Sequence, residues 1–180
     1  MVIISLVFFF TTSGNAQRFV TKTGFIRFYS DAPMEKIEAV NRQVNAGLEV
    51  STGDFSFKVL LKSFSFEKAL MQQHFNESYV ESDKYPDATF LGKITNIKDV
   101  NLNKDKVYNV TLTGRLTIHG ETKIINEKGT LEVKEGKILA KGKFNILLSD
   151  YKITVPASVI SKISNTIEIT VDVVLDKINP

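Results

Sequence analysis

The chain of 180 residues contains no cysteine, no tryptophan and only four prolines. The absence of cysteine excludes disulfide bonds, thiol nucleophiles, cysteine-ligated metal and iron–sulfur centres, and the acylated N-terminal cysteine of a lipoprotein. The sequence also lacks an excess of charge of either sign and long runs of like charge. Its 23 basic and 20 acidic residues are mixed along the chain. This distribution argues against a dedicated nucleic-acid-binding stripe. The composition, 43% hydrophobic and 24% charged, is that of one ordinary globular domain.

The N-terminal segment carries an export pattern. Residues 1–16 include no charged side chain and hold an apolar run from Val2 to Phe10. As a helix this run would extend about 15 Å, roughly half of a bilayer's hydrocarbon core, which is too short for a transmembrane anchor. Gly14 and Ala16 occupy the small-residue positions that precede a signal-peptidase cut, although no Lys or Arg precedes the run. We predict a signal peptide over 1–16 and a periplasmic or secreted protein that begins at Gln17, with a buried N-terminal strand as the alternative.

Beyond residue 17, apolar residues alternate with a period of two in segments that turn residues separate. Such alternation is typical of antiparallel strands with one buried face. The eight segments are 19–29, 37–50, 55–61, 89–97, 107–118, 124–133, 138–148 and 166–175. The dipeptides His119-Gly120 and Glu135-Gly136 link consecutive late segments, and such glycine-containing links are typical of hairpins.

Two segments predict helix rather than strand. Residues 65–78 are rich in helix formers, and Ser65 can cap this helix with Glu67 in its first turn. Pro156 favours a short helical turn before the last strand. Eight antiparallel strands leave two exposed edges unless the sheet closes. We therefore expect an all-β fold, an eight-stranded antiparallel barrel with one crossing α-helix and a short helical turn, as one domain over 17–180.

Four glycines bear on whether this barrel is hollow. Gly92, Gly114, Gly129 and Gly142 all fall in the apolar-face phase of successive strands. A missing side chain at four inward positions removes volume from the core, which predicts a lumen. The alternative is that these glycines permit the sharp coiling of a small barrel or mark bulges, and the two interpretations are compatible.

Several blocks of sequence carry a family resemblance. The most specific is Met-Gln-Gln-His-Phe-Asn-Glu-Ser-Tyr-Val-Glu-Ser-Asp-Lys-Tyr-Pro at 71–86, followed by Ala-Thr-Phe-Leu-Gly at 88–92. Weaker blocks are Phe-Ser-Phe at 64–66, Gly-Arg-Leu-Thr-Ile-His-Gly-Glu-Thr-Lys at 114–123, Phe144, and Asp-Tyr-Lys-Ile at 150–153. In this order they resemble the YceI-like family of exported lipid- or polyisoprenoid-binding proteins. The resemblance implies a lipocalin-like, lipid-binding barrel domain over 17–180 whose hydrophobic tunnel holds a long isoprenoid. Some relatives bind fatty-acyl amphiphiles or quinone-type lipids, so the identity of the chain's lipid stays open.

The candidate ligand-binding residues come from the apolar faces of the predicted strands. A polyprenyl or acyl chain offers only CH₂ and CH₃ groups, so it needs an apolar lining, and each buried CH₂ contributes about 0.8 kcal/mol. The candidate lining residues are Phe55, Phe57, Val59, Phe90, Ile94, Tyr108, Val110, Leu112, Leu116, Phe144, Ile146, Ile167, Ile169 and Val171, with plain core packing as the alternative for each. His74 and Tyr79 are candidates for a head group near the tunnel mouth, whereas residues 76–86 can equally form a hydrogen-bonded lid loop.

Patterns for catalysis or metal binding are weak. His74 and His119 are the two histidines, and neither an HExxH spacing nor a GxSxG elbow occurs. His74 and Glu77 could supply two metal ligands if His119 or a carboxylate approached, and a polar helix face is the alternative. We expect no catalytic residue, no metal, no cofactor, no membrane span and no nucleic-acid partner. Besides a lipid carrier, two hypotheses stay open: a structural or interaction module, which could be a homodimer, and a cryptic hydrolase or isomerase.

Overall fold

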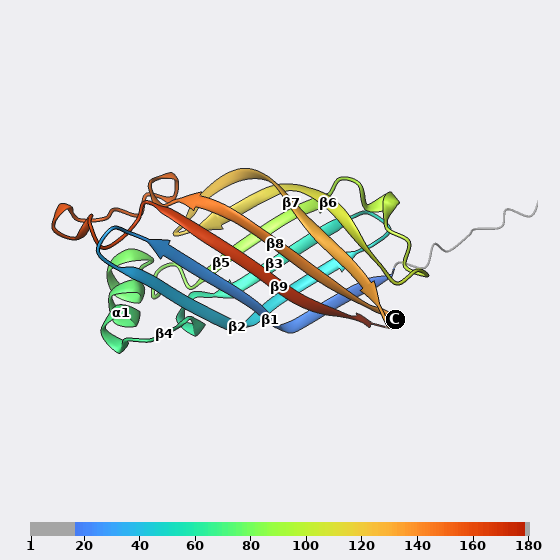
Figure 1. The fold of residues 1–180 in the computed structure, drawn as a ribbon, viewed down its shortest axis with the longest axis horizontal. Coiled ribbons are helices and arrows are strands. Elements are labelled where there is room, and N and C mark those ends of the chain that lie inside the picture. Colours follow the sequence, from blue (N-terminus) through green and yellow to red (C-terminus); the bar gives the residue numbers. More distant parts are fainter. Residues whose placement is uncertain (1–16, 179–180) are drawn as a thin grey trace, which may run out of the picture.

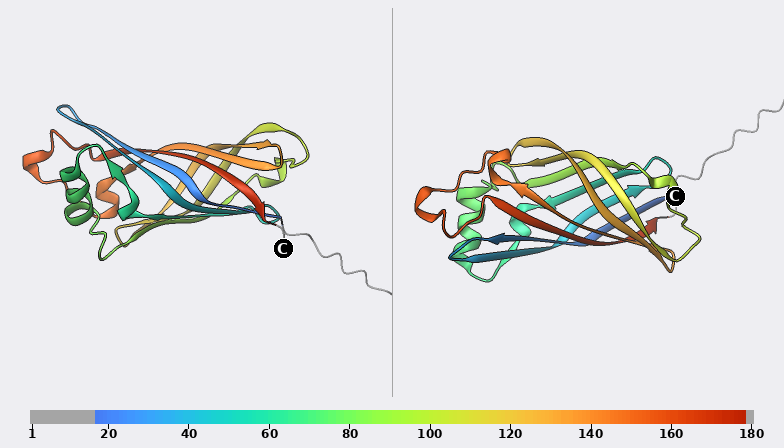
Figure 2. Two further views of the ribbon diagram at one scale, coloured as in Figure 1. Left: turned by 90° about the horizontal axis from the view of Figure 1, so that it is seen from below. Right: turned by 45° about the horizontal axis from the view of Figure 1, so that its top comes forward.

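The computed structural model describes residues 17–178, so the predicted signal peptide at 1–16 lies outside the described residues. The strands are β1 (Arg18–Asp31), β2 (Lys36–Glu49), β3 (Asp54–Leu60), β4 (Ser65–Phe66), β5 (Asp87–Ile94), β6 (Lys106–Ile118), β7 (Glu121–Lys134), β8 (Lys137–Leu147) and β9 (Thr166–Ile178). They form one sheet in the order β1-β9-β8-β7-β6-β5-β3-β2-β4, and an additional β1–β2 pairing closes it. All pairings are antiparallel, and the eight long strands make the elongated barrel that the sequence predicts (Figures 1 and 2).

The two glycine-containing links are tight hairpin turns. His119 and Gly120, which connect β6 to β7, have φ angles of 51° and 75°. Glu135 and Gly136, which connect β7 to β8, have φ angles of 50° and 75°. Two consecutive positive φ values are the geometry of a type I′ turn, whose twist matches that of the flanking strands. The expected hairpins are therefore confirmed.

The helical segment is shorter than the sequence predicts. Helix α1 spans Ala69–His74, and a turn of π-helix over Phe75–Tyr79 follows it. Ser65 does not cap the helix: Ser65–Phe66 pair with β2 as the short strand β4, and Lys68 is still extended. The helix begins later in the sequence than predicted because pairing with β2 holds Ser65 and Phe66 in an extended conformation.

The other helical elements are single turns of 3₁₀-helix. They span Leu61–Ser63, Ile97–Asp99, Leu148–Tyr151 and Ala157–Val159. The last of them is the short turn expected near Pro156. Pro156 itself is extended and immediately precedes the turn rather than occupying its first position.

The barrel interior is densely packed at one end. Side chains from all eight long strands and the β5–β6 loop form a continuous core there, which we call the closed-end core. Its residues are Phe19, Ala46, Leu48, Phe55, Ile94, Ile97, Val100, Val110, Leu131, Val133, Ile138, Ala140, Val173 and Leu175. We call the opposite end, where α1 and the β8–β9 loop lie, the open end (Figure 1).

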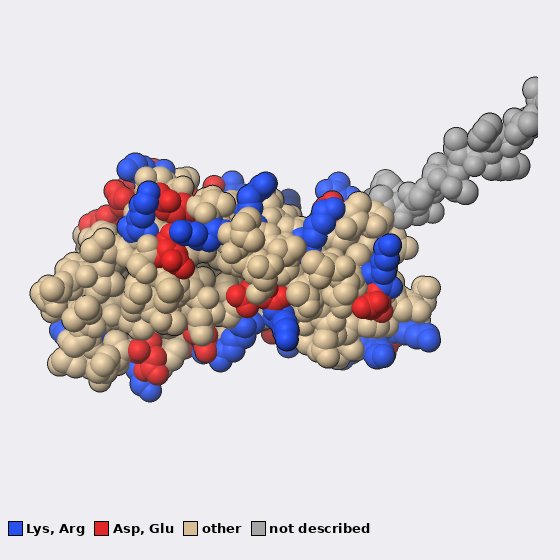
Figure 3. Space-filling view, turned by 90° about the horizontal axis from the view of Figure 1, so that it is seen from above, with Lys and Arg blue, Asp and Glu red and all other residues tan. Residues whose placement is uncertain are grey.

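The outer surface is charged but mixed in sign. Ion pairs join neighbouring strands: Lys141 lies 3.2 Å from Asp172, and Glu168 lies 2.8 Å from Lys143 and 3.0 Å from Arg27. Partly exposed pairs of this kind contribute about 0–1 kcal/mol each. Figure 3 shows acidic and basic side chains intermixed on one face. Within residues 17–178, no helix has the length and apolar character needed to cross a membrane.

Candidate functional site

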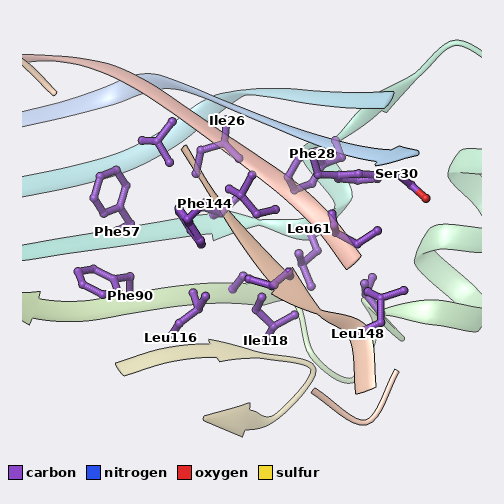
Figure 4. Close-up of a pocket in the computed structure, with 18 of the residues that line it drawn as sticks. Ile26, Phe28, Ser30, Phe57, Leu61, Phe90, Leu116, Ile118, Phe144 and Leu148 are labelled. Carbon is purple, nitrogen blue, oxygen red and sulfur yellow. The ribbon is translucent and has the colours of Figure 1, made fainter. Parts of the chain in front are cut away.

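The open half of the barrel contains an apolar cavity of about 560 Å³. This volume is within the range of about 300–1,000 Å³ that is usual for small-molecule sites. All eight long strands contribute to its wall, and the side chains of Ile26, Phe57, Phe90 and Phe144 are among those that reach into it (Figure 4). The lumen that the inward glycines predict is therefore present.

The four inward glycines serve different purposes. A Cβ atom on Gly92 would lie 2.3 Å from a backbone oxygen of β6, and one on Gly114 would lie 2.5 Å from the Cα of Gly92. These two glycines permit a close approach of β5 and β6. A Cβ atom on Gly142 would meet no heavy atom within 4 Å, so Gly142 borders open space. Gly129 pairs with Gly142 and also lines the cavity, although a Cβ there would lie 2.6 Å from a backbone oxygen of β8.

Most of the predicted site residues line the cavity. From the strands these are Phe55, Phe57, Val59, Phe90, Val110, Leu112, Leu116, Phe144, Ile146, Ile167, Ile169 and Val171, and from the open end His74 and Tyr79. Their contact with a ligand stays a prediction.

Two predicted site residues lie away from the cavity. Ile94 is 2% exposed and belongs to the closed-end core. Tyr108 packs against the same core, and its hydroxyl donates a hydrogen bond to the carbonyl oxygen of Asn101 at 3.2 Å. Both side chains point to the barrel interior, as those of the lining residues do. They lie too near the closed end to reach the cavity.

Four aromatic rings that are not among the predicted site residues form part of the cavity wall at the open end. The ring of Phe28 on β1 lies 5.4 Å from the rings of Phe64 and Phe75, and Phe66 lies 5.1 Å from Phe75. All four line the cavity. Rings at such distances attract one another beyond their shared burial. The cluster therefore holds the helical segment against the barrel, and the Phe-Ser-Phe block at 64–66 is its clearest signal in the sequence.

Polar contacts fix the segment that follows the π-helical turn. His119 lies in the β6–β7 turn, and its Nδ1 donates a hydrogen bond to the carbonyl oxygen of Tyr151 at 3.1 Å. Its Nε2 lies 2.7 Å from Oε2 of Glu81, and the ring of Tyr85 packs edge-on against the imidazole at 4.7 Å. The phenol of Tyr151 is itself buried, and burial raises its pKa to about 12. His119 thus connects three segments around the open end, which supports a lid loop over residues 76–86.

Replacing His119 with asparagine is expected to loosen this lid loop while the barrel stays folded. Asparagine tolerates the positive φ of the turn, but its shorter side chain cannot make both hydrogen bonds. Hydrogen bonds to charged groups contribute about 1.5–3 kcal/mol. Hydrogen-exchange mass spectrometry should show faster exchange in residues 76–86 and unchanged exchange in β8 and β9. His74→Ala is the control, because the structure shows no side-chain hydrogen bond for His74 among the described residues. Unchanged protection of 76–86 in His119→Asn would contradict the expectation.

The two histidines do not form a metal site together. Glu77, which could act as a metal ligand beside His74, accepts a hydrogen bond from Nε2 of Gln73 at 3.2 Å. His119 is engaged with Glu81 and Tyr151 instead. In the part of the chain that the structure describes, no three His, Cys, Asp or Glu side chains are grouped to hold a metal ion. Among these described residues, the His74–Glu77 pair therefore has no third ligand.

Comparison with known proteins agrees with this architecture. One similar solved structure is a polyisoprenoid-binding domain from Saccharophagus degradans that is implicated in plant cell wall breakdown. It is 16% identical to this chain with a TM-score of 0.77, and the match covers 92% of this chain and 99% of that domain. BcnA of Burkholderia cenocepacia is 15% identical with a TM-score of 0.67, covering 84% and 95%. The YCEI protein of Campylobacter jejuni is 21% identical with a TM-score of 0.61, covering 79% and 85%. At these identities the likeness establishes the fold.

Sequence comparison supplies the family. No curated protein gives a significant match. The model of the YceI-like domain matches residues 10–175, which is nearly the whole chain. The chain therefore belongs to the YceI-like family.

Proposed function

We propose that the protein is an exported carrier that holds one polyisoprenoid, or a similar long-chain amphiphile, in the barrel cavity. The observation that carries the proposal is the cavity itself, about 560 Å³ with largely apolar walls. Each CH₂ group that moves from water into such a cavity contributes about 0.8 kcal/mol, so a long aliphatic chain suits it better than a compact polar molecule. The S. degradans domain of the same fold, described as polyisoprenoid-binding, supports the same ligand class.

The proposed carrier binds without catalysing a reaction. Its cavity wall is built from long apolar strand faces, and the charged residues that line it are divided between loops around the opening and the middle of β7 and β8 rather than gathered around one point. A hydrolase or isomerase needs converging titratable groups around a reacting atom. A binding function accordingly fits this wall better than the enzyme hypothesis does.

Gentle chloroform extraction of the purified mature protein, followed by mass spectrometry, tests the ligand class. We expect one dominant long-chain lipid in an amount close to that of the protein. The delipidated protein should then take up the apolar dye N-phenyl-1-naphthylamine and release it when geranylgeraniol is added. A protein that yields no lipid, takes up no dye and forms a stable homodimer would favour the interaction-module hypothesis instead.

Export is tested separately from ligand binding. Expression of the whole chain in a Gram-negative host, followed by fractionation, is expected to place the protein in the periplasm or medium. N-terminal sequencing should then begin at Gln17. A cytoplasmic protein that retains residues 1–16 would contradict the signal-peptide prediction without affecting the cavity.

A further inference from the structure

The barrel wall opens on one side, between β7 and β8. β7 pairs with β6 from end to end, and β8 pairs with β9 in the same way. β7 and β8 pair with each other only between the Gly129–Gly142 and Lys134–Lys137 partners. Toward the open end the two strands have no mutual pairing. We call the place where they diverge the fork, residues 127–130 of β7 and 141–143 of β8, and the cavity extends to it.

Glu127 stands at the fork and faces the cavity. On β7 it falls in the same phase as Ile125, Gly129 and Leu131, and it lines the cavity together with them. Lys128 and Lys141 also border the cavity, but they fall in the outward phase of their strands. Among the charged lining residues described, Glu127 is thus the one in the inward phase of a barrel strand. Glu127 is partly buried, and this burial raises the pKa of its carboxyl because the charged form is less well hydrated than at an open surface.

In the described part of the chain, the carboxylate of Glu127 has no partner of opposite charge. The lysines of β8 beside the fork are already paired with β9, Lys141 with Asp172 at 3.2 Å and Lys143 with Glu168 at 2.8 Å. Within residues 17–178, Glu127 forms neither an ion pair nor a side-chain hydrogen bond. A partly buried charge without a partner loses hydration and gains nothing in return. Its oxygens are therefore free to accept hydrogen bonds from a molecule in the cavity.

We propose that Glu127 binds the head group of the lipid by accepting a hydrogen bond from a hydroxyl, and that it disfavours anionic head groups. This assignment rests on the proposed carrier function and narrows its ligand to long-chain alcohols, phenols and quinols. A hydrogen bond to a carboxylate is roughly twice as strong as one between neutral groups. A diphosphate or carboxylate at the same place would bring like charges together at a partly buried carboxylate, which is unfavourable. The head group then lies at the fork, and the tail reaches toward the aromatic cluster at the open end.

The test compares two ligands with the same tail. Geranylgeraniol and geranylgeranyl diphosphate compete with N-phenyl-1-naphthylamine for the delipidated mature protein. In the unaltered protein we expect the alcohol to displace the dye at a concentration about tenfold lower than the diphosphate does. In Glu127→Gln, which keeps the shape of the side chain and removes its charge, we expect the two concentrations to differ by less than about threefold. Glu132→Gln is the matched control, since Glu132 lies on β7 in the outward phase and should leave the ratio unchanged.

Failure of this inference is distinguishable from failure of the carrier proposal. If Glu127→Gln shows the same alcohol-to-diphosphate ratio as the unaltered protein, while both ligands still displace the dye, Glu127 has no head-group role and the carrier proposal stands. If neither ligand nor dye binds the unaltered protein, the carrier proposal falls and the head-group assignment falls with it. A preference for the diphosphate in the unaltered protein would also overturn the assignment.

Discussion

Replacing Gly142 with phenylalanine is expected to lower the affinity for geranylgeraniol by at least about tenfold, with the barrel still folded. Gly142 is an inward position of β8 that lines the cavity, and a Cβ atom there would meet no heavy atom within 4 Å, so the backbone leaves room for a side chain that enters the cavity. The ring occupies volume that at least two CH₂ groups of a ligand would otherwise fill. At about 0.8 kcal/mol each, their loss exceeds the roughly 1.4 kcal/mol that corresponds to a factor of ten. Dye displacement on the delipidated protein measures the change.

Two variants control for this substitution. Leu139→Phe adds the same ring to the same strand at an outward position, so it should leave the affinity unchanged. Gly142→Ala adds only a methyl group and should have a small effect. Equal affinities for Gly142→Phe and the unaltered protein would mean that the lipid does not occupy this part of the cavity.

The strands and hairpins could be predicted from the sequence because both depend on local chemistry. Alternation along 166–175 places Ile167, Ile169 and Val171 on one face of β9, and the dipeptide His119-Gly120 lies where φ is positive. The alternation does not show how far along the barrel axis a residue lies. Val171 lines the cavity, whereas Val173, in the same phase, is fully buried in the closed-end core. The positions of Ile94 and Tyr108 outside the cavity have this origin.

Other features depend on contacts between distant segments. Ser65 is a residue type that often caps helices. Its pairing with β2, a segment distant in sequence, keeps it extended, so the helix begins only at Ala69. Glu127 interrupts the apolar face of its strand, and the sequence alone gives no reason to regard it as more than a surface acid. Its significance comes from the divergence of β7 and β8, which only the pairing of four strands reveals. The sequence thus predicts which residues face inward and the presence of a lumen, but not where that lumen ends or opens.

The two halves of the barrel should respond differently to truncated side chains. Leu175 is 0% exposed and belongs to the closed-end core, so Leu175→Ala is expected to reduce the free energy of unfolding by about 2–5 kcal/mol. Ile169, on the same strand, lines the cavity and is only partly buried, so it has fewer packing contacts to lose and Ile169→Ala should cost about 1 kcal/mol in the delipidated protein. Urea unfolding followed by circular dichroism measures both values. Val174→Ala is the control, because Val174 is 41% exposed and should change stability by less than about 0.5 kcal/mol.

Adding lipid should narrow the difference in cost between these two substitutions. A ligand that binds only the folded state stabilises it in proportion to the logarithm of its concentration over its Kd. Geranylgeraniol should therefore stabilise Leu175→Ala as much as it stabilises the unaltered protein, since the closed-end core makes no contact with the cavity at Leu175. It should stabilise Ile169→Ala less, because part of the wall against the tail is missing. Equal costs for Leu175→Ala and Ile169→Ala without lipid, and equal gains with it, would mean that the open half is packed as tightly as the closed end, which contradicts a hollow carrier.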